Sequence, residues 1–202
     1  MLKIEDRNGV RCIGLNRPEK RNAIGVELTM AMQDVLTRTK HDASIHALLF
    51  YGVGGHFCAG MDMKDFFDSS TRPADVLQQA RAATENWRTR LLYEVPQVIF
   101  SAVQGYCLGA AMPILNASDI VLASDDAKFG LPEINFGFVP GGQIVKAVGQ
   151  MMPRRGLSYA ALTGKPFDAQ RAREWGLVTD VVQDPFERAL MLASAVAARR
   201  AA

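Results

Sequence analysis

The sequence has little of what several large classes of protein require. It contains three cysteines and three histidines among 202 residues, and their spacing fits no metal-ligand motif. Its apolar runs all break well before the roughly 18 residues that a membrane-spanning helix needs. The 23 basic and 21 acidic residues give a formal charge of only +2, so no strong field favours nucleic acid or a membrane surface. We therefore expect no metal site, no nucleic-acid partner and no membrane partner.

What is present is the composition of a globular chain. Apolar residues make up 49% and charged residues 22%, which is enough for one hydrophobic core at this length. Residues 1–6 are too acidic for a secretory signal, and Cys12, Cys58 and Cys107 are most simply reduced thiols. We expect a single domain over residues 1–202, located in the cytoplasm.

Apolar runs and turn residues predict alternating strands and helices. Strands are expected at 2–7, 10–15, 45–51, 97–103, 119–123 and 177–182, and helices at about 26–40, 73–94, 141–151, 154–163, 168–175 and 186–200. Such alternation is typical of an α/β fold with a largely parallel sheet. The alanine-rich run at 193–202 offers few anchors, so its last residues are expected to fray.

A strand, a glycine-containing turn and a helix start follow one another twice. Phe57–Asp62 follows the strand at 45–51, and Gly105–Met112 follows the strand at 97–103. Backbone N–H groups at a helix start lack partners and can hold a negatively charged oxygen, and Asp62 is a good N-cap. Two such turns could each donate one N–H to a single oxygen, as in an oxyanion hole. The alternative is that these glycines serve only tight turns and helix packing.

Glu133 is the carboxylate that stands out. It follows Pro132 and lies between the apolar residues Leu131 and Ile134, so partial burial is expected. Burial raises the pKa of a carboxyl group, which then can act as a general base or acid near neutral pH. The alternative is a glutamate that caps or pairs at the surface of a loop.

Six motifs in the same order and register carry a resemblance to a known family. They are Asn16-Arg17-Pro18 with Arg21-Asn22-Ala23, Phe57–Asp62 with Lys64, Gly105–Ala110, Asp119-Ile120, Phe129-Gly130 with Pro132-Glu133, and Gly137 with Pro140-Gly141. From about Ile4 to Val182 the chain resembles the crotonase superfamily of enoyl-CoA hydratases and isomerases. The resemblance implies a crotonase-like spiral of ββα units over residues 1–182, a C-terminal helix over 183–202, and a homotrimer or hexamer.

The resemblance also implies a substrate and its binding residues. The substrate would be an acyl-CoA thioester, with no cofactor beyond the coenzyme A that it carries. The N–H groups of Met61 and Ala110 would hold the thioester oxygen, and Glu133 would move the proton. Residues placed where the family binds coenzyme A are Arg21, Ala23, Ala59 and Lys64.

The residues of these motifs are most similar to those of the hydroxycinnamoyl-CoA (feruloyl-CoA) hydratase-lyases, with two differences in the acyl pocket. Phe66 stands where those enzymes carry a tyrosine that reads the phenolic hydroxyl. Pro113 stands where they carry a serine and where ordinary hydratases have the first of two catalytic glutamates. Proline can neither donate nor accept a proton, so only Glu133 matches a catalytic acid.

The C-terminal helical segment looks shortened relative to the family. Members usually continue through further helices that cover the acyl pocket and build the trimer, whereas here the final helix starts at about Phe186. We expect closure of the pocket to come from elsewhere in the chain, to come from a neighbouring subunit, or to be missing.

The function expected is that of an enoyl-CoA hydratase-like enzyme, a C–O lyase of fatty acid metabolism. It would add water across the double bond of an enoyl-CoA through an enolate held in the oxyanion hole. One alternative is a double-bond isomerase that uses Glu133 as its single base. Another is a weakly catalytic homologue that binds coenzyme A. The sequence leaves the acyl group open.

Overall fold

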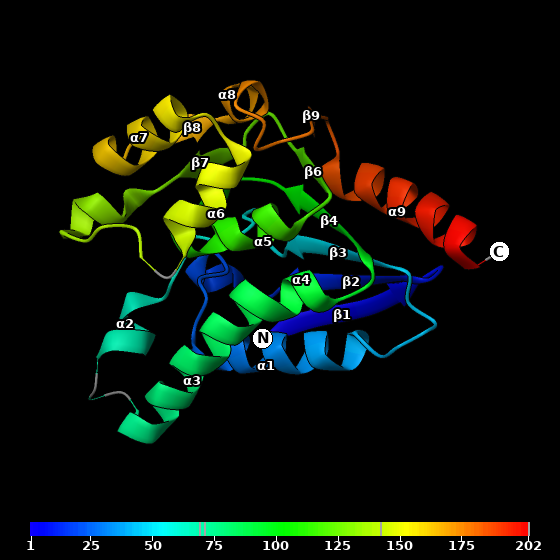
Figure 1. Cartoon of the computed structure of the whole chain (residues 1–202), viewed down its shortest axis with the longest axis horizontal. Helices are drawn as coiled ribbons and strands as arrows, with labels where there is room; N and C mark the ends of the chain where they lie inside the picture. The colour runs from blue at the N-terminus through cyan, green and yellow to red at the C-terminus, as the bar shows by residue number, and fades with distance from the viewer. Residues whose placement is uncertain (69, 71, 142, 202) are drawn as a thin grey trace.

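Two sheets organise the chain in the computed structural model, which describes residues 1–68, 70, 72–141 and 143–201 (Figure 1). The larger sheet has the order β1-β2-β3-β4-β6-β9, and every pair except β1–β2 is parallel. Its strands are β1 (Leu2–Arg7), β2 (Val10–Leu15), β3 (Ala47–Gly52), β4 (Val98–Val103), β6 (Ile120–Ala123) and β9 (Asp180–Val181). The predicted α/β fold with a largely parallel sheet is confirmed.

Helices fill most of the connections between these strands. The α-helices are α1 (Val26–Thr39), α2 (Met63–Phe67), α3 (Ala74–Asn86), α4 (Leu92–Glu94), α5 (Met112–Ala117), α6 (Ile144–Met151), α7 (Arg154–Thr163), α8 (Ala169–Glu174) and α9 (Pro185–Ala201). Shorter turns of helix are η1 (Pro18–Lys20), η2 (Trp87–Leu91), η3 (Gly109–Ala111) and η4 (Pro132–Phe136). In the described part of the chain, none of these helices combines the length and apolar character needed to cross a membrane.

The first two strands form a hairpin. Asn8 and Gly9 have φ angles of 51° and 75°, and two consecutive positive values are what a two-residue hairpin turn with the correct twist requires. The register pairs Leu2 with Leu15 and Arg7 with Val10. Local turn chemistry therefore sets this edge of the sheet.

Alternating residues of the large sheet face two separate cores. On β3, Leu48 and Phe50 join the main core with α1, whereas Ala47 and Leu49 pack with α9. Figure 1 shows α1 and α9 on either side of the strands. The strands read as continuous apolar runs because both faces are covered.

The C-terminal helix α9 is firmly anchored. Ala189, Ala193 and Ala197 are at most 1% exposed and pack on the sheet, and the Arg200 Nη1 donates to the Pro96 carbonyl oxygen at 2.8 Å. The helix continues through Ala201, so this run has more anchors than its sequence indicates, and fraying of its last residues stays a prediction. Because alanine recurs at every fourth residue on this face, the helix backbone approaches the strands closely. The small size of alanine does not by itself predict this packing.

The predicted helix over 73–94 contains a π-helical turn. After α3 the hydrogen-bond pattern widens over η2 before α4 completes the segment. The extra residue in such a turn changes which side chains point inward. Trp87 and Arg88 are consequently both buried, at 0% and 5% exposure.

Chain segments that follow the strands of the large sheet form a second, smaller sheet. This sheet has the order β5 (Tyr106–Leu108), β7 (Lys128–Gly130) and β8 (Phe167–Asp168), with β5 and β7 parallel. Cys58 forms a parallel bridge with Cys107, because the Cys58 N–H donates to the Tyr106 oxygen at 2.8 Å and the Leu108 N–H donates to the Cys58 oxygen at 3.0 Å. The two glycine-containing turns therefore lie side by side.

Asn22 ties the loop after β2 to the turn after β3. Its side chain is fully buried and accepts from the Arg17 N–H at 2.8 Å. Its amide nitrogen donates to the carbonyl oxygens of Val53 and His56, at 2.9 and 2.6 Å. One side chain thus satisfies three backbone groups of two loops that are distant in sequence.

We expect the Asn22→Ala variant to lose about 2–4 kcal/mol of unfolding free energy, because it leaves three partly buried backbone groups without their hydrogen-bond partner. Urea unfolding followed by circular dichroism measures this loss. Asn22 has a φ of 57°, so Asn22→Gly, which relieves the backbone strain, should lose a similar amount.

Asn86→Ala is the matched control, since Asn86 makes one side-chain hydrogen bond, to Gln33 at 3.2 Å. It should change stability by no more than about 0.5 kcal/mol. An Asn22→Gly variant as stable as the wild type would show that the three bonds do not hold the loops together.

Candidate active site

The two turns approach each other at Gly60. This residue has a φ of 95°, and a Cβ atom placed on it would lie 3.0 Å from the Leu108 carbonyl oxygen and 3.6 Å from the Ala110 nitrogen. Glycine is therefore required here both by the backbone conformation and by the close approach. The arrangement puts Met61, which follows Gly60, beside Ala110.

The backbone N–H groups of Met61 and Ala110 are available as donors. The residues around Met61 are hydrogen-bonded, with the Ile24 N–H donating to the Gly60 oxygen at 2.8 Å and the Asp62 N–H donating to the Ile24 oxygen at 2.9 Å. Within the described ranges, the N–H groups of Met61 and Ala110 themselves donate to no protein acceptor. Two free donors on adjacent turns are the arrangement that could bind one oxygen atom.

Asp62 holds the Met61 turn in place from the other side. Its carboxylate accepts from the Asp65 N–H at 3.2 Å, which confirms the predicted N-cap of α2, and pairs with Arg17 at 3.1 Å. Both side chains of this ion pair are less than 15% exposed. The Arg17 guanidinium also donates to the Ala23 carbonyl oxygen at 2.9 Å, so one ion pair connects three segments.

Glu133 lies against the Ala110 turn. A Cβ atom on Gly109 would be 2.5 Å from Oε1 of Glu133, so the carboxylate rests directly on the Gly109 backbone. The register of β5 and β7 causes this, because Leu108 pairs with Gly130 and both strands lead directly into the site. Glu133 follows in η4, whose start at Pro132 turns the side chain toward Gly109.

Burial raises the pKa of Glu133 above its ordinary value. Desolvation of the carboxylate is the main cause, and the residue's own backbone N–H and the charge of Arg88 act in the opposite direction. Among described residues, Oε2 is buried and has no hydrogen-bond partner. The predicted partial burial is confirmed, and such a group can both accept and release a proton.

The position of Pro113 supplies no second acid. It is buried in the first turn of α5, and the charged side chain that acts on Glu133 is the cation Arg88. Glu85 is the carboxylate residue lining the cleft beside Met61, among the described residues. In the same part of the chain, no group of three or more histidine, cysteine or acidic residues could hold a metal ion.

Three of the four residues expected to bind coenzyme A come together. The Ala59 N–H donates to the Arg21 carbonyl oxygen at 2.9 Å, and Ala23 precedes Ile24, which forms a parallel bridge with Met61. The Arg21 guanidinium lies over the Tyr106 ring at 5.6 Å. Lys64 is exposed on α2, three residues beyond Met61.

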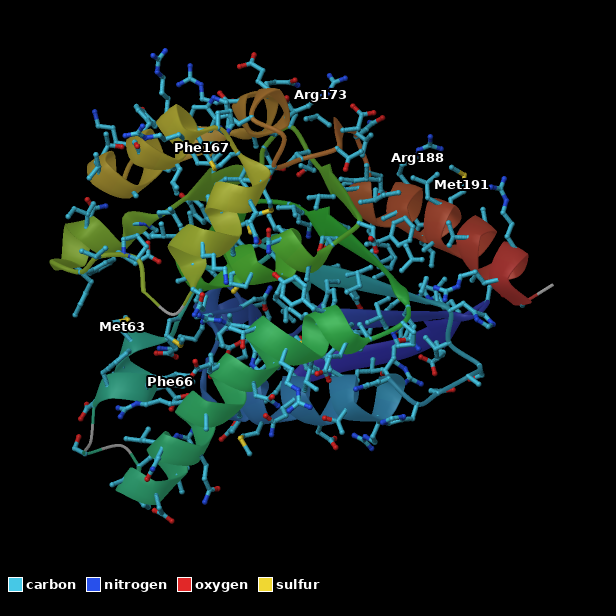
Figure 2. The ribbon with its side chains drawn as sticks, viewed as in Figure 1. Met63, Phe66, Phe167, Arg173, Arg188 and Met191 are labelled. Atoms are coloured by element: carbon cyan, nitrogen blue, oxygen red, sulfur yellow. The ribbon has the colours of Figure 1, made fainter. Side chains whose placement is uncertain are left out.

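The two residues expected in the acyl pocket line two adjoining cavities. Phe66, shown on α2 in Figure 2, lines a cleft of about 330 Å³ together with Met61. Pro113 lines a cavity of about 230 Å³. Arg88 and Gln143 line both. The sequence did not predict a role for Arg88, because the 3.6-residue period of an α-helix places it beside the buried face of the helix. The π turn moves its side chain into the interior.

The cysteines near the two turns are buried, protonated thiols. Cys58 and Cys107 are fully buried, and burial raises the pKa of Cys58 to about 12 and that of Cys107 well above its usual range. All three cysteines are free. The expectation of reduced thiols in or near the core fits this burial.

Sequence and structure comparisons point to one family. The profile described as enoyl-CoA hydratase/isomerase matches residues 5–200. Hydroxycinnamoyl-CoA hydratase-lyase of Pseudomonas fluorescens is 36% identical over 182 residues, which is 90% of this chain and 66% of that protein. For 2,3-dehydroadipyl-CoA hydratase of Escherichia coli the identity is 32% over 202 residues, with 97% and 75% covered.

A solved structure extends the similarity to the fold. The enoyl-CoA hydratase/isomerase of Pseudoalteromonas atlantica superposes with a TM-score of 0.83 at 31% identity, covering 97% of this chain and 76% of that one. The overlap confirms the crotonase-like fold that the motifs imply. The chain spans about two thirds of the length of the hydratase-lyase that it matches.

The raised pKa of Glu133 predicts a pH-dependent effect of the Glu133→Gln substitution on stability. The folded state holds this proton more tightly than the unfolded state, so the wild type loses stability as pH rises from about 4.5 through the raised pKa. Glutamine does not titrate. The unfolding free energy of the variant should therefore increase relative to wild type across that window and then level off.

Urea unfolding at a series of pH values from 4.5 to 8 measures the difference. Glu174→Gln is the control, because Glu174 is exposed and its variant should differ from wild type by a nearly constant amount. A Glu133→Gln difference that is equally flat would contradict the burial of the carboxylate.

Proposed function

The chain belongs to the enoyl-CoA hydratase/isomerase family, and we propose that it adds water across the double bond of an enoyl-CoA thioester. The observation that carries this proposal is the contact between the Glu133 carboxylate and Gly109, the residue before the free N–H of Ala110. That contact places a proton-transfer group next to an oxygen-binding turn. Acid–base chemistry beside a stabilised oxyanion is what hydration of such a thioester needs.

In the proposed reaction, the thioester oxygen accepts hydrogen bonds from the N–H groups of Met61 and Ala110. The Glu133 carboxylate takes a proton from water while the water oxygen bonds to C3 of the acyl chain. The electrons of the double bond move to the thioester, whose enolate oxygen the two donors stabilise, each by about 3 kcal/mol. Glu133 then returns the proton to C2.

A second candidate is a double-bond isomerase. The observation that favours it is Pro113, which leaves Glu133 without a second carboxyl group to share the work on water. A single base can remove a proton at one carbon and return it two carbons away through the same enolate. A weakly catalytic coenzyme A-binding homologue is the third candidate, and turnover distinguishes it from both.

The coenzyme A part of the substrate is proposed to bind along Arg21, Ala23 and Ala59, with Lys64 near its phosphates. The contact between the Arg21 and Ala59 backbones supports one continuous surface. No cofactor is proposed beyond the coenzyme A of the substrate. The reduced state of all three cysteines agrees with the cytoplasm, and fatty acid metabolism is one setting in which such thioesters arise.

We further propose that the protein forms a homotrimer or hexamer. Phe136, Phe138 and Val139, which follow Glu133 in the chain, are between 52% and 79% exposed, and Leu162 on α7 is 75% exposed. Large exposed apolar side chains are typical of a surface that another subunit covers. Light scattering that returns the mass of a single chain at micromolar concentration would contradict this assembly.

The Glu133→Gln variant should lose about 10²–10⁴-fold in kcat on its preferred enoyl-CoA, because the amide cannot transfer the proton. Its affinity for a saturated acyl-CoA should stay within a few-fold of wild type, since the thioester oxygen does not contact Glu133. Steady-state kinetics on crotonyl-CoA, a 3-enoyl-CoA and feruloyl-CoA measure the loss and identify the reaction.

Glu174→Gln again serves as the matched control and should retain wild-type kcat. Hydration of crotonyl-CoA supports the hydratase, whereas conversion of the 3-enoyl-CoA without hydration supports the isomerase. If the wild type binds saturated acyl-CoA but converts no member of the panel, the enzyme proposal fails. Equal activity of wild type and Glu133→Gln would instead remove Glu133 from the mechanism.

A further inference from the structure

Arg88 is a buried cation at the centre of the proposed acyl region. It lies in the π turn η2 and is 5% exposed, and burial lowers its pKa. Taking a guanidinium out of water is costly, and proteins retain one where it has oxygen atoms to bind. Irregular turns of this kind occur often at functional sites. The proposed mechanism does not use this residue.

Arg88 and Gln143 line two neighbouring cavities. The cleft of about 330 Å³ runs from Met61, at the proposed oxyanion site, past the rings of Phe66 and Phe67 to Arg88. The cavity of about 230 Å³ begins at Arg88 and Pro113 and extends toward α6. An acyl chain that extends from the thioester along the first cavity as far as Arg88 would therefore lie at the edge of the second.

Two polar residues that line the first cavity already bond to other groups of the protein. Arg81 donates to the Phe66 carbonyl oxygen at 3.0 Å and lies over the Phe67 ring at 5.6 Å. Thr84 donates to the Ala80 carbonyl oxygen at 2.7 Å, and it also lies 3.0 Å from the Thr29 hydroxyl. Near Met61 this cleft offers a substrate chiefly the apolar surface of α2, and Glu85 is the carboxylate residue among its described lining residues.

The second cavity combines apolar surface with polar groups and two cations. Its charged lining consists of Arg88 and Lys146, with no carboxylate among the described lining residues. Lys146 is exposed on α6 and has no ion-pair partner within the described part of the chain. The remaining polar groups include Asn116, whose amide donates to the Tyr93 hydroxyl and to Gln150 at 3.0 Å. Its small volume suits a terminal anionic group.

We propose that the substrate is an enoyl-CoA whose acyl chain ends in a carboxylate, which Arg88 and Lys146 bind beyond Pro113. This inference rests on the proposed thioester substrate and specifies its acyl group. Arg88 would bind the carboxylate from the buried side of the cavity, and Lys146 would bind it from the solvent side. Proline at position 113 contributes an apolar wall between the reacting carbons and that charge.

The competing explanation is that Arg88 serves only as a countercharge to Glu85 and Glu133. In that case the charge of the acyl terminus has no influence on affinity, and Lys146 has no role. Charge preference and its dependence on Lys146 therefore separate the two explanations.

The test compares matched substrates with the full chain. Values of kcat/KM are measured for crotonyl-CoA against pent-2-enedioyl-CoA, and for hex-2-enoyl-CoA against hex-2-enedioyl-CoA. We expect the wild type to favour the carboxylate member of a pair by at least tenfold. Lys146→Gln should reduce that ratio several-fold, and Arg88→Gln should reduce it further, with Arg88→Lys keeping part of it. Lys165→Gln, at another exposed lysine, should leave the ratio unchanged.

Binding of saturated analogues makes the test independent of turnover. Calorimetry gives dissociation constants for glutaryl-CoA and butyryl-CoA on the wild type and on Lys146→Gln, whose exposed site leaves folding intact. A preference for glutaryl-CoA that Lys146→Gln weakens supports the inference even if no enoyl-CoA is converted, and only the proposed function then fails. Equal affinity of the wild type for both ligands, or a preference that neither Lys146→Gln nor Arg88→Gln changes, overturns it.

Discussion

The site depends on the pairing of two chain segments that follow neighbouring strands. In the chain segments that follow β3 and β4, Cys58 pairs with Cys107. Gly60 therefore lies in contact with the backbone of Leu108 and Ala110. This pairing puts two free N–H groups on adjacent turns. The same strand β5 pairs with β7, which carries Glu133 to Gly109. One short sheet thus assembles donors and carboxylate from three distant parts of the sequence.

Burial of the Glu133 carboxylate and a small number of nearby charges determine the electrostatics of the site. Desolvation raises the pKa of Glu133, and Arg88 opposes that shift without removing it. Pro113 holds an apolar position in the first turn of α5, so Glu133 is the described carboxylate against the Gly109 turn, while Glu85 lines the neighbouring cleft beside the buried cation Arg88. The proposed mechanism gives the Glu133 carboxylate both proton transfers, and the proposed substrate gives Arg88 a role in recognising the acyl terminus.

Much of this arrangement can be predicted from the sequence, for identifiable reasons. The hairpin at Asn8-Gly9 and the N-cap at Asp62 are local chemistry, so short patterns suffice. The adjacency of the two turns depends on strand pairing across 49 residues, from Cys58 to Cys107. The repeated strand–turn–helix pattern left it as one of two interpretations, and the ordered family motifs favoured it. Arg88 was missed because a π turn breaks the 3.6-residue period. The anchoring of α9 was missed because alanine burial depends on how closely a helix approaches a sheet.

The central claim is that the N–H groups of Met61 and Ala110 bind one thioester oxygen beside Glu133. A crystal structure with a saturated acyl-CoA bound tests it most directly. The account predicts that the thioester oxygen lies about 2.7–3.1 Å from both nitrogen atoms, with C2 and C3 of the acyl chain facing the Glu133 carboxylate. A thioester oxygen bonded to neither nitrogen, or an acyl chain directed away from Glu133, would contradict it.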